Sequence, residues 1–401
     1  MSQMTQKPAL SLSKTLVPKA VGLQHQSHLG EEIIRALLFF CGAVSIFTTV
    51  GIITTLGQEA LYFFTNWQYL ETNKSTTTII SETDTTLILT SGGLPVRVGD
   101  VLAFDDELLL VETVTQSNTV TVTRGFDNTT AIPHVANRPV EKAVRISLLE
   151  YFGTGEWAPQ IGKFGIWPLL MATIIISVIG FIVAIPLGLG SAIFLSEYCS
   201  EPQRRVIKPI LEILAGIPTV VLGFFALTFV TPGLQSIHFI QSIFGTQVEF
   251  QNMLAAGLTV GLILIPLVST ISEDALRAVP VAMREASLGL GATRFETSVK
   301  VLIPSALSGI LAAIILAGSR AFGETMIVAL AAGSGPRLTL NPFAAAETIT
   351  GHIARISGGD ISYHSVDYNS LFSLALVLFV VTLLLNIGSN IVSARFREAY
   401  Q

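Results

Sequence analysis

The chain has 401 residues, of which 50% are hydrophobic and only 13% are charged. Because soluble domains average about 25% charged residues, this composition excludes an ordinary soluble enzyme and indicates an integral membrane protein. The net charge of −5 says little, because membrane topology depends on where Lys and Arg lie and not on their sum. The two cysteines, Cys41 and Cys199, do not form a metal or disulfide framework.

The first thirty residues are polar, and we expect residues 1–30 to form a cytoplasmic N-terminal tail. They lack the short apolar core and small-residue cleavage site of a secretory signal peptide. We expect the first transmembrane helix at 31–57, because its apolar part, 33–56, is long enough to remain in the bilayer as an anchor.

The hydrophobic pattern predicts an α-helical integral membrane protein with about six transmembrane helices, since each span needs roughly 20 mainly apolar residues. The predicted spans are 33–56, 166–195, 210–231, 253–272, 304–332 and 371–393. Pro186, Pro218 and Pro266 lie inside them, where neighbouring helices can satisfy the carbonyls that a proline kink frees.

Basic residues in the short loops and at the ends predict the orientation. They are Lys7, Lys14, Lys19, Arg204, Arg205, Lys208, Arg277, Arg284, Arg294, Lys300, Arg395 and Arg397. The loop at 232–252 contains no Lys or Arg. The positive-inside rule therefore places both termini in the cytoplasm, as in a multi-pass plasma-membrane protein.

A different kind of sequence separates the first two spans. TTTIIS, TLILTS, VRVGDVLAF, ELLLVETVT and TVTVTRGF alternate apolar and polar residues between turn formers, which is typical of short strands. We expect an extracytoplasmic region at 58–165 that contains a small all-β domain at about 75–148. A spacer or docking surface is a better interpretation of this insertion than a catalytic site.

The segment VPVAMREASLGLGATRFETSVKVLIP, residues 279–304, lies in a predicted cytoplasmic loop at about 273–303. The pattern predicts a short helix over 281–288, broken by Gly289-Leu290-Gly291. Thr293 and Glu296 have the spacing of a capping box, which predicts a second short helix. An ordinary amphipathic linker between spans is the alternative interpretation.

These residues resemble the EAA motif of ABC importer permeases. Its pattern of E-A-A, three residues, G, nine residues and I-x-L-P is matched by Glu285, Ala286, Ser287, Gly291, Val301, Ile303 and Pro304. Three positions depart conservatively, with Ser for Ala, Val for Ile and Ile for Leu. The resemblance implies that this loop couples the permease to a separate ATPase subunit, by a helix that docks in a groove.

Further stretches narrow the resemblance. IPLGLGSAIFLSEY, EILAGIPTVVLGFFAL and SRAFGETMIV are similar to the permeases of the phosphate-specific Pst system, and the insertion is more PstC-like than PstA-like. The resemblance covers about 160–398 and implies a type I ABC importer permease core at 166–398. It also implies a PstA-like second permease, a PstB-like ATPase dimer carrying ATP-Mg and a PstS-like extracytoplasmic phosphate-binding protein.

The sequence contains no Walker P-loop, so we expect no ATP hydrolysis on this chain alone. Cation-ligand clusters and catalytic triads are not visible either, so we expect no metal, no catalytic site and no cofactor on this chain, and no nucleic-acid partner. ATP hydrolysis is expected on the separate subunit. The resemblance to Pst permeases implies the function of a transporter subunit in ATP-driven phosphate import across a bacterial plasma membrane, which is the inner membrane if the cell is Gram-negative.

Two charges interrupt the predicted fifth span. Arg320 and Glu324 are four residues apart, so we expect them on one inward face of a helix. A guanidinium fork suits phosphate oxygens, and Ser319 and Thr325 would add hydroxyls to this substrate path. The resemblance implies a transport role for the arginine and the glutamate. An internal ion pair that fixes helix packing is the alternative.

His352 and Arg355 lie in the predicted last external loop, and a solvated loop is the favoured interpretation over an anion vestibule or a contact with the binding protein. Three further functions remain open at this point. One is the same machine for another oxyanion such as molybdate or sulfate. The others, of different classes, are a proton-coupled secondary transporter and a membrane-anchored scaffold.

Overall fold

The computed structural model describes residues 29–115, 118–237, 247–363 and 365–395. The described residues fall into two units that divide between Thr54 and Thr55. The basic residues predicted to orient the chain at Lys7, Lys14, Lys19 and Arg397 lie outside the described residues, as does part of the loop at 232–252.

Among the described residues, five helices are long and apolar enough to cross a membrane, or six if one bent pair counts as a single span. This confirms the prediction of a helical membrane protein with about six spans. The five correspond to α1 (Leu29–Thr65), α3 (Trp167–Ile193) with the π-helical turn that follows it, the segment Thr219–Ser236, α8 (Met253–Arg277) and α15 (Val366–Arg395). The second half of the bent pair is α12 (Leu307–Phe322).

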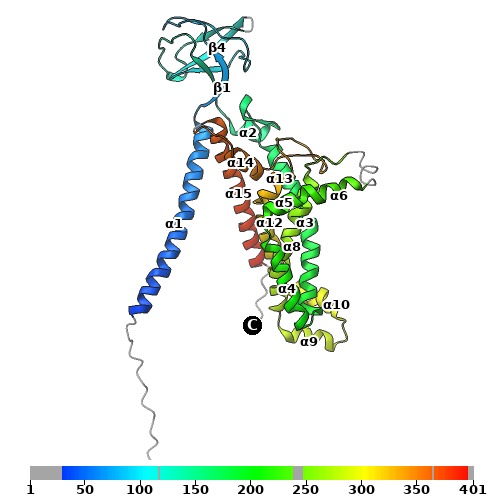
Figure 1. Ribbon diagram of the computed structural model, residues 1–401. Coiled ribbons are helices and arrows are strands. Elements are labelled where there is room, and N and C mark those ends of the chain that lie inside the picture. The colour runs from blue at the N-terminus through cyan, green and yellow to red at the C-terminus, as the bar shows by residue number, and fades with distance from the viewer. Residues whose placement is uncertain (1–28, 116–117, 238–246, 364, 396–401) are drawn as a thin grey trace, which may run out of the picture. The chain divides into compact units, whose positions relative to one another are not determined.

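Helices α3 and α8 form the closest helix pair of the second unit and lie side by side along most of their lengths (Figure 1). Glycines make this approach possible. A Cβ on Gly261 would lie 2.8 Å from the Val183 Cβ and 2.9 Å from the Gly180 carbonyl oxygen, and one on Gly257 would lie 2.6 Å from the Ile179 Cβ. Small residues at such an interface let two membrane helices pack backbone to backbone.

Gly261→Ala should therefore destabilise the membrane bundle by about 1–3 kcal/mol, because the new methyl group meets backbone that cannot move aside. Gly190→Ala is the matched control, since a Cβ on this α3 glycine meets nothing within 4 Å. The measurement is thermal unfolding in detergent. Equal melting temperatures for the two variants would contradict this account of the interface.

The predicted span at 210–231 is wrong in its start. The structure has a separate helix α4 (Glu201–Gly216), a break, and then α5 (Thr219–Phe225), a π-helical turn (Ala226–Val230) and α6 (Thr231–Ser236). Pro218 ends one helix rather than kinking it, because the residue before a proline is pushed out of the helical region and Ile217 has ψ 128°. The candidate span is Thr219–Ser236.

The predicted span at 304–332 is also wrong as one continuous helix. The range opens at the end of a helical segment that starts earlier in the chain, with α10 (Arg294–Thr297), a π-helical turn (Ser298–Leu302) and α11 (Ile303–Ser305). After α11 the chain bends by 75° into α12. Helix α12 ends at Phe322, and a short helix, α13 (Met326–Ala331), follows after a three-residue break. Helix α14 (Ile349–Ser357) completes this region.

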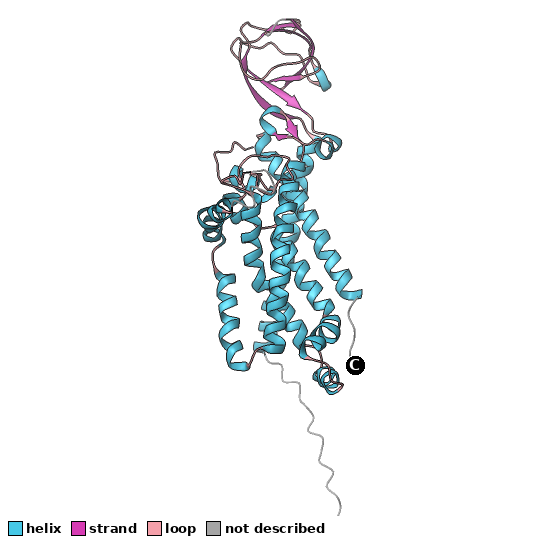
Figure 2. Ribbon diagram, turned by 90° about the vertical axis from the view of Figure 1, so that its right-hand side faces the viewer, coloured by secondary structure: helices cyan, strands magenta, loops and turns pink. Residues whose placement is uncertain are grey.

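The insertion after the first helix contains a six-stranded antiparallel sheet in the order β1-β6-β3-β4-β5-β2 (Figure 2, strands in magenta). The strands are β1 (Gln68–Ser75), β2 (Thr86–Ile88), β3 (Val101–Phe104), β4 (Glu107–Thr115), β5 (Thr119–Thr123) and β6 (Pro139–Val144). A helix α2 (Leu148–Gly153) and a short hairpin of β7 (Trp157–Ala158) and β8 (Lys163–Phe164) lead to α3.

The chain just past the end of β1 meets the chain at the end of β2, through an isolated bridge between Thr76 and Leu89, so the sheet closes into a barrel. Thr77 N–H donates to the Ile88 carbonyl at 2.9 Å, and Thr90 N–H donates to the Ser75 carbonyl at 2.9 Å. The predicted strand TTTIIS is wrong, because its residues form only isolated bridges at Thr76 and Ile80.

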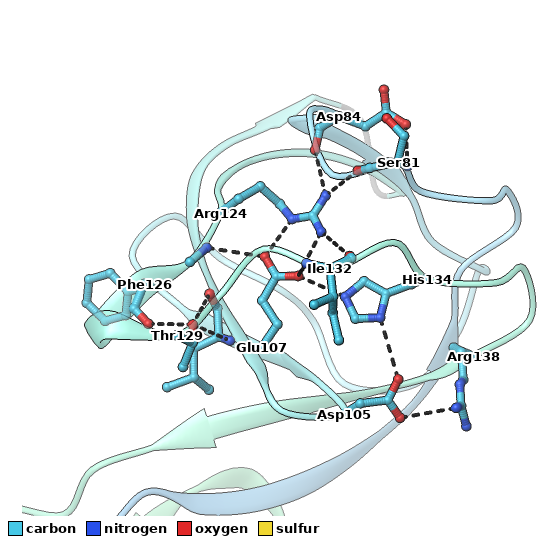
Figure 3. Close-up of polar contacts among 12 residues, drawn as sticks. Ser81, Asp84, Asp105, Glu107, Arg124, Phe126, Thr129, Ile132, His134 and Arg138 are labelled. Carbon is cyan, nitrogen blue, oxygen red and sulfur yellow. Dashed lines mark hydrogen bonds and ion pairs between the residues drawn. The ribbon is translucent and has the colours of Figure 1, made fainter.

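One end of the barrel holds a buried ionic cluster centred on Glu107 (Figure 3). The Arg124 guanidinium forms two hydrogen bonds to Glu107, at 2.6 and 2.7 Å, and His134 Nε2 lies 2.9 Å from the same carboxylate. Ile132 and Gly125 add backbone N–H donors. Burial would raise the pKa of Glu107, but these hydrogen bonds outweigh it and lower the pKa to about 2.

Candidate functional site

The charged residues of the fifth predicted span lie at the break between α12 and α13. Arg320 is in the last turn of α12 and is exposed. Within the described part of the chain, its guanidinium has no hydrogen-bond or ion-pair partner. A cation in a membrane helix without a protein partner is unusual, because such groups normally pair inside the protein or face a polar pathway.

Glu324 is in the break itself and has a different environment. Its side chain is buried, and Oε1 accepts hydrogen bonds from the backbone N–H groups of Thr325, Met326 and Ile327, at 3.1, 3.2 and 3.3 Å. These are free N–H groups at the start of α13, so the carboxylate caps that helix. Thr350 Oγ1 donates to the Glu324 carbonyl at 2.7 Å and holds the break from the side of α14.

The expectation that Arg320 and Glu324 share one helix face is therefore wrong, because the helix ends between them. The two described side chains form no ion pair within 4.0 Å. Each side chain lies instead at a helix end whose partial charge is opposite to its own. Arg320 is at the partially negative C-terminus of α12, and Glu324 is at the partially positive N-terminus of α13. The break lets the membrane domain hold two charges without joining them to each other.

The two predicted hydroxyls are engaged within the protein. Ser319 Oγ donates to Asn386 Oδ1 of α15 at 3.1 Å, and also lies 3.4 Å from the Ile315 carbonyl. Thr325 Oγ1 donates to the Gly323 carbonyl at 3.1 Å. Ser319 thus connects α12 to α15 one residue before Arg320, and Thr325 stabilises the break.

The EAA-like loop forms α9 (Val281–Gly289) and α10, as the sequence predicts. Thr293 Oγ1 accepts from Glu296 N–H and the Glu296 carboxylate accepts from Thr293 N–H, so the capping box is confirmed. Gly291 has φ 87°, a conformation that favours glycine. Both short helices lie at one end of α3 and α8, while α13 and α14 lie toward the other (Figure 1).

Helix α9 has an inner and an outer side. Met283 packs in an apolar cluster with residues of α3, α8 and α12, and Ser287 Oγ lies 2.9 Å from Thr297 Oγ1 of α10. The outer side is exposed. It presents Val281, Glu285, Ala286, Leu288 and, just beyond the helix, Leu290. Two of the three EAA positions are therefore free for a partner, and the third, Ser287, fixes the loop internally. Pro304 lies in α11, where the loop joins the bend.

A polar cluster that the sequence did not predict is centred on Glu347. Its carboxylate accepts from Arg355 Nε at 2.6 Å and Nη2 at 3.1 Å, and lies 3.1 Å from His352 Nδ1. Trp157 Nε1 donates to His352 Nε2 at 3.1 Å, which places the ring proton of a neutral His352 on Nδ1. Burial would raise the pKa of Glu347, but the hydrogen bonds from His352 and Arg355 lower it.

The interpretation of His352 and Arg355 as a solvated loop is wrong. Both residues are on α14, and His352 is buried. The Arg355 side chain remains 44% exposed, but its Nε and Nη2 donate to Glu347, so the guanidinium is held by a carboxylate. One signal in the sequence was available: Glu347 is a lone carboxylate in the apolar stretch NPFAAAETIT.

Among the residues that the structure describes, no group of three or more His, Cys, Asp or Glu side chains is placed to hold a metal ion.

Comparison with known proteins shows the family of this chain. Residues 184–398 match the family described as binding-protein-dependent transport system inner membrane component. The probable ABC transporter permease protein YqgH of Bacillus subtilis is 33% identical over 62% of this chain and 79% of that protein. The phosphate transport system permease protein PstC of Mesorhizobium japonicum is 35% identical over 57% of this chain and 73% of that protein.

Among solved structures, the inward-facing MetNI methionine ABC transporter aligns with 58% of this chain and 95% of that chain, at 20% identity and a TM-score of 0.40. The family match covers more than half of the chain, and it includes the EAA-like loop and both charges at the helix break. This chain therefore belongs to the family of binding-protein-dependent transport system inner membrane components: it is a multi-pass permease of an ABC importer, whose ATPase is a separate subunit.

Proposed function

We propose that this permease carries inorganic phosphate and that Arg320 meets the anion during passage. The observation that supports this most directly is the exposed Arg320 guanidinium, which keeps all its N–H groups free of protein acceptors in the described chain. Several relatives at about 30–35% identity are named as phosphate transport permeases. Phosphate oxygens fit the paired donors of an arginine fork.

The helix break supports the same proposal. If Glu324 paired with Arg320, the guanidinium would be neutralised and an arriving anion would have to displace a carboxylate. Glu324 is instead occupied by three backbone N–H groups of α13. This arrangement places the Glu324 carboxylate near the phosphate path, where it can select for an oxyanion that carries a proton. The Arg320 guanidinium stays free to bind that anion because Glu324 does not pair with it.

The partners follow from this proposal. The permease pairs with a PstA-like second permease, and the two meet a PstB-like ATPase dimer and a PstS-like extracytoplasmic binding protein. The exposed outer side of α9, with Glu285 and Ala286, docks in a groove of the ATPase on the cytoplasmic side. The chain has both termini in the cytoplasm of a bacterial cell, with its core at 166–398 in the plasma membrane.

The barrel lies outside the membrane in this proposal, within the extracytoplasmic region 58–165. Its separate apolar core supports a role as a spacer or docking surface for the binding protein. The helices on either side of it supply the transport path.

The test is uptake into vesicles that contain the complete complex. Labelled phosphate should accumulate in an ATP-dependent way, and an excess of unlabelled sulfate or molybdate should not compete. Accumulation of either competing anion in place of phosphate would contradict the substrate assignment while leaving the family membership intact.

Gly291 gives a separate prediction about the coupling loop. Gly291→Val should raise the ATP hydrolysed per phosphate imported, because a β-branched residue at φ 87° strains the turn by about 1–2 kcal/mol and displaces α9. A Cβ there meets nothing within 4 Å, so the effect comes from backbone strain and not from a clash. Gly291→Asn is the matched control, since Asn tolerates left-handed backbone and should remain close to the parent ratio.

A further inference from the structure

The inner side of α9 carries one charged residue, Arg284. Its Nη2 donates to the backbone carbonyl of Leu276 at 2.7 Å and lies 3.3 Å from the Glu197 carboxylate. Leu276 is in the last turn of α8, and Glu197 is in the π-helical turn (Phe194–Tyr198) that continues α3. A single guanidinium therefore contacts the ends of both helices of the closest pair in the membrane domain.

Both acceptors suit a cation. The Leu276 carbonyl is one of the last carbonyls of α8, where a helix carries a partial negative charge, and the backbone hydrogen bond that it accepts from Val279 N–H is long, at 3.4 Å. The ion pair is shielded, since the side chains of Arg284 and Glu197 are 21% and 14% exposed. Shielding from water strengthens this contact relative to a surface ion pair.

Glu197 is itself held in place from two directions. Ser196 Oγ donates to its carboxylate at 2.7 Å, and Arg294 Nη1 of α10 lies 3.5 Å from its backbone carbonyl. The end of α3 is thus contacted by both short helices of the loop. Met283 and Ser287 hold α9 against its neighbours but make no charged contact with α3 or α8.

We propose that Arg284 is a positioning residue that transmits displacement of α9 to α3 and α8 together. This inference rests on the proposed docking of α9 on an ATPase subunit. When the ATPase moves α9, the Arg284 guanidinium pulls through Nη2 on the Glu197 side chain and on the Leu276 carbonyl at once, so the two packed helices move as one body. Without this contact, α9 stays docked and follows the ATPase, and its movement still reaches α8 through residues 278–280 of the backbone, but it reaches α3 only through apolar contacts that can slide.

The experiment compares ATP hydrolysis with phosphate uptake in the complete complex in vesicles. Arg284→Gln should leave hydrolysis per complex near the parent value and lower phosphate imported per ATP by about tenfold, the effect of one charge-assisted hydrogen bond. Glu197→Gln should lower the phosphate imported per ATP less than Arg284→Gln does, because the contact between Arg284 and the Leu276 carbonyl is retained. Arg284→Lys should recover part of the loss, since an ammonium retains the charge but not the planar donor geometry of the guanidinium.

Lys300→Gln is the control, because Lys300 is 72% exposed and its ion pair is with Glu296 of the same loop. A cysteine at Leu290, which is 91% exposed, reports docking by crosslinking to the ATPase in each variant. Retained crosslinking with a lowered ratio supports the proposal. An unchanged ratio in Arg284→Gln, or hydrolysis and crosslinking lost together with uptake, overturns it.

The two proposals fail in different ways. No crosslink from Leu290→Cys in the parent complex refutes the docking of α9 on an ATPase. The ratio of uptake to hydrolysis in the Arg284 variants still decides whether the contact with α3 and α8 matters for coupling.

Discussion

Replacing Arg320 with alanine is expected to lower phosphate uptake by roughly a hundredfold, the effect of losing two charge-assisted hydrogen bonds to the anion. Assembly should be retained, because in the described chain this side chain makes no hydrogen bond or ion pair whose loss would leave a buried partner. Uptake is measured per assembled complex, quantified from the same vesicles. Arg205→Ala, which also removes an exposed arginine but lies on α4, is the control and should transport normally.

Two further variants separate substrate binding from helix stability. Arg320→Lys should restore little uptake, since an ammonium does not reproduce the planar fork. Glu324→Ala should deplete the assembled protein, because it leaves three N–H groups of α13 without their acceptor, whereas Glu324→Gln keeps an acceptor oxygen and should assemble. Normal uptake by a stably assembled Arg320→Ala would reject the role of Arg320 in transport.

Replacing Glu107 with leucine is expected to destabilise the barrel by about 3–5 kcal/mol, because it leaves the buried Arg124 without its counter-charge. The measurement is hydrogen exchange of the barrel amides, such as those of Val111 and Val122, in the full chain. A double replacement, Glu107→Leu with Arg124→Met, should recover part of the loss since no unpaired charge remains. Glu82→Gln, at an exposed barrel residue, is the control.

The same carboxylate sets how the barrel responds to acid. The pKa of Glu107 is lowered in the folded barrel from 4.5 to about 2. The ionised carboxylate therefore stabilises the folded barrel in full at any pH well above 4.5, the pKa of the unfolded chain. That contribution is lost as the pH falls below 4.5 and through 2. Parent and Glu107→Gln barrels should therefore differ most near neutral pH and converge in strong acid. A difference that grew as the pH fell would contradict the ion-pair account.

The transmembrane helices α3, α8 and α15 were predictable because a span needs only length and low charge. The breaks were not. A hydrophobic window averages over Pro218 and does not register that Ile217 leaves the helix. The spacing of Arg320 and Glu324 predicts one face only if the helix continues, and its end at Phe322 depends on contacts such as the Thr350 hydrogen bond from a distant segment.

The strands show a second limit of sequence patterns. The predicted all-β insertion is present, but β1 was missed because its inward residues include Gln68, Thr72 and Lys74. These polar groups are buried with partners: the Lys74 ammonium lies 3.3 Å from the Thr90 carbonyl, and Thr72 donates to the Val140 carbonyl. Alternation of hydrophobicity does not reveal a strand whose buried side is polar.

The coupling loop was predictable at the level of its local structure. Its helix starts, its capping box at Thr293 and its glycine turn are set by residues within a few positions of each other. The Arg284 contacts were not, since Glu197 lies far away in the sequence and only the packing of α3 on α8 brings it near. Family membership also replaces the earlier hypotheses of a secondary transporter and a scaffold.

The closure of the barrel has a consequence for crowding. A sheet with a free outer strand exposes a row of unpaired N–H and C=O groups, which can recruit a strand from another molecule. Tethering to a membrane confines neighbouring copies to two dimensions and raises the frequency of such encounters. The hydrogen bonds from Thr77 and Thr90 occupy these groups within the same chain. Many copies of the chain can therefore lie close together in the membrane without forming β-sheet between their insertions. This holds also before the chain has assembled with the other subunits of the importer.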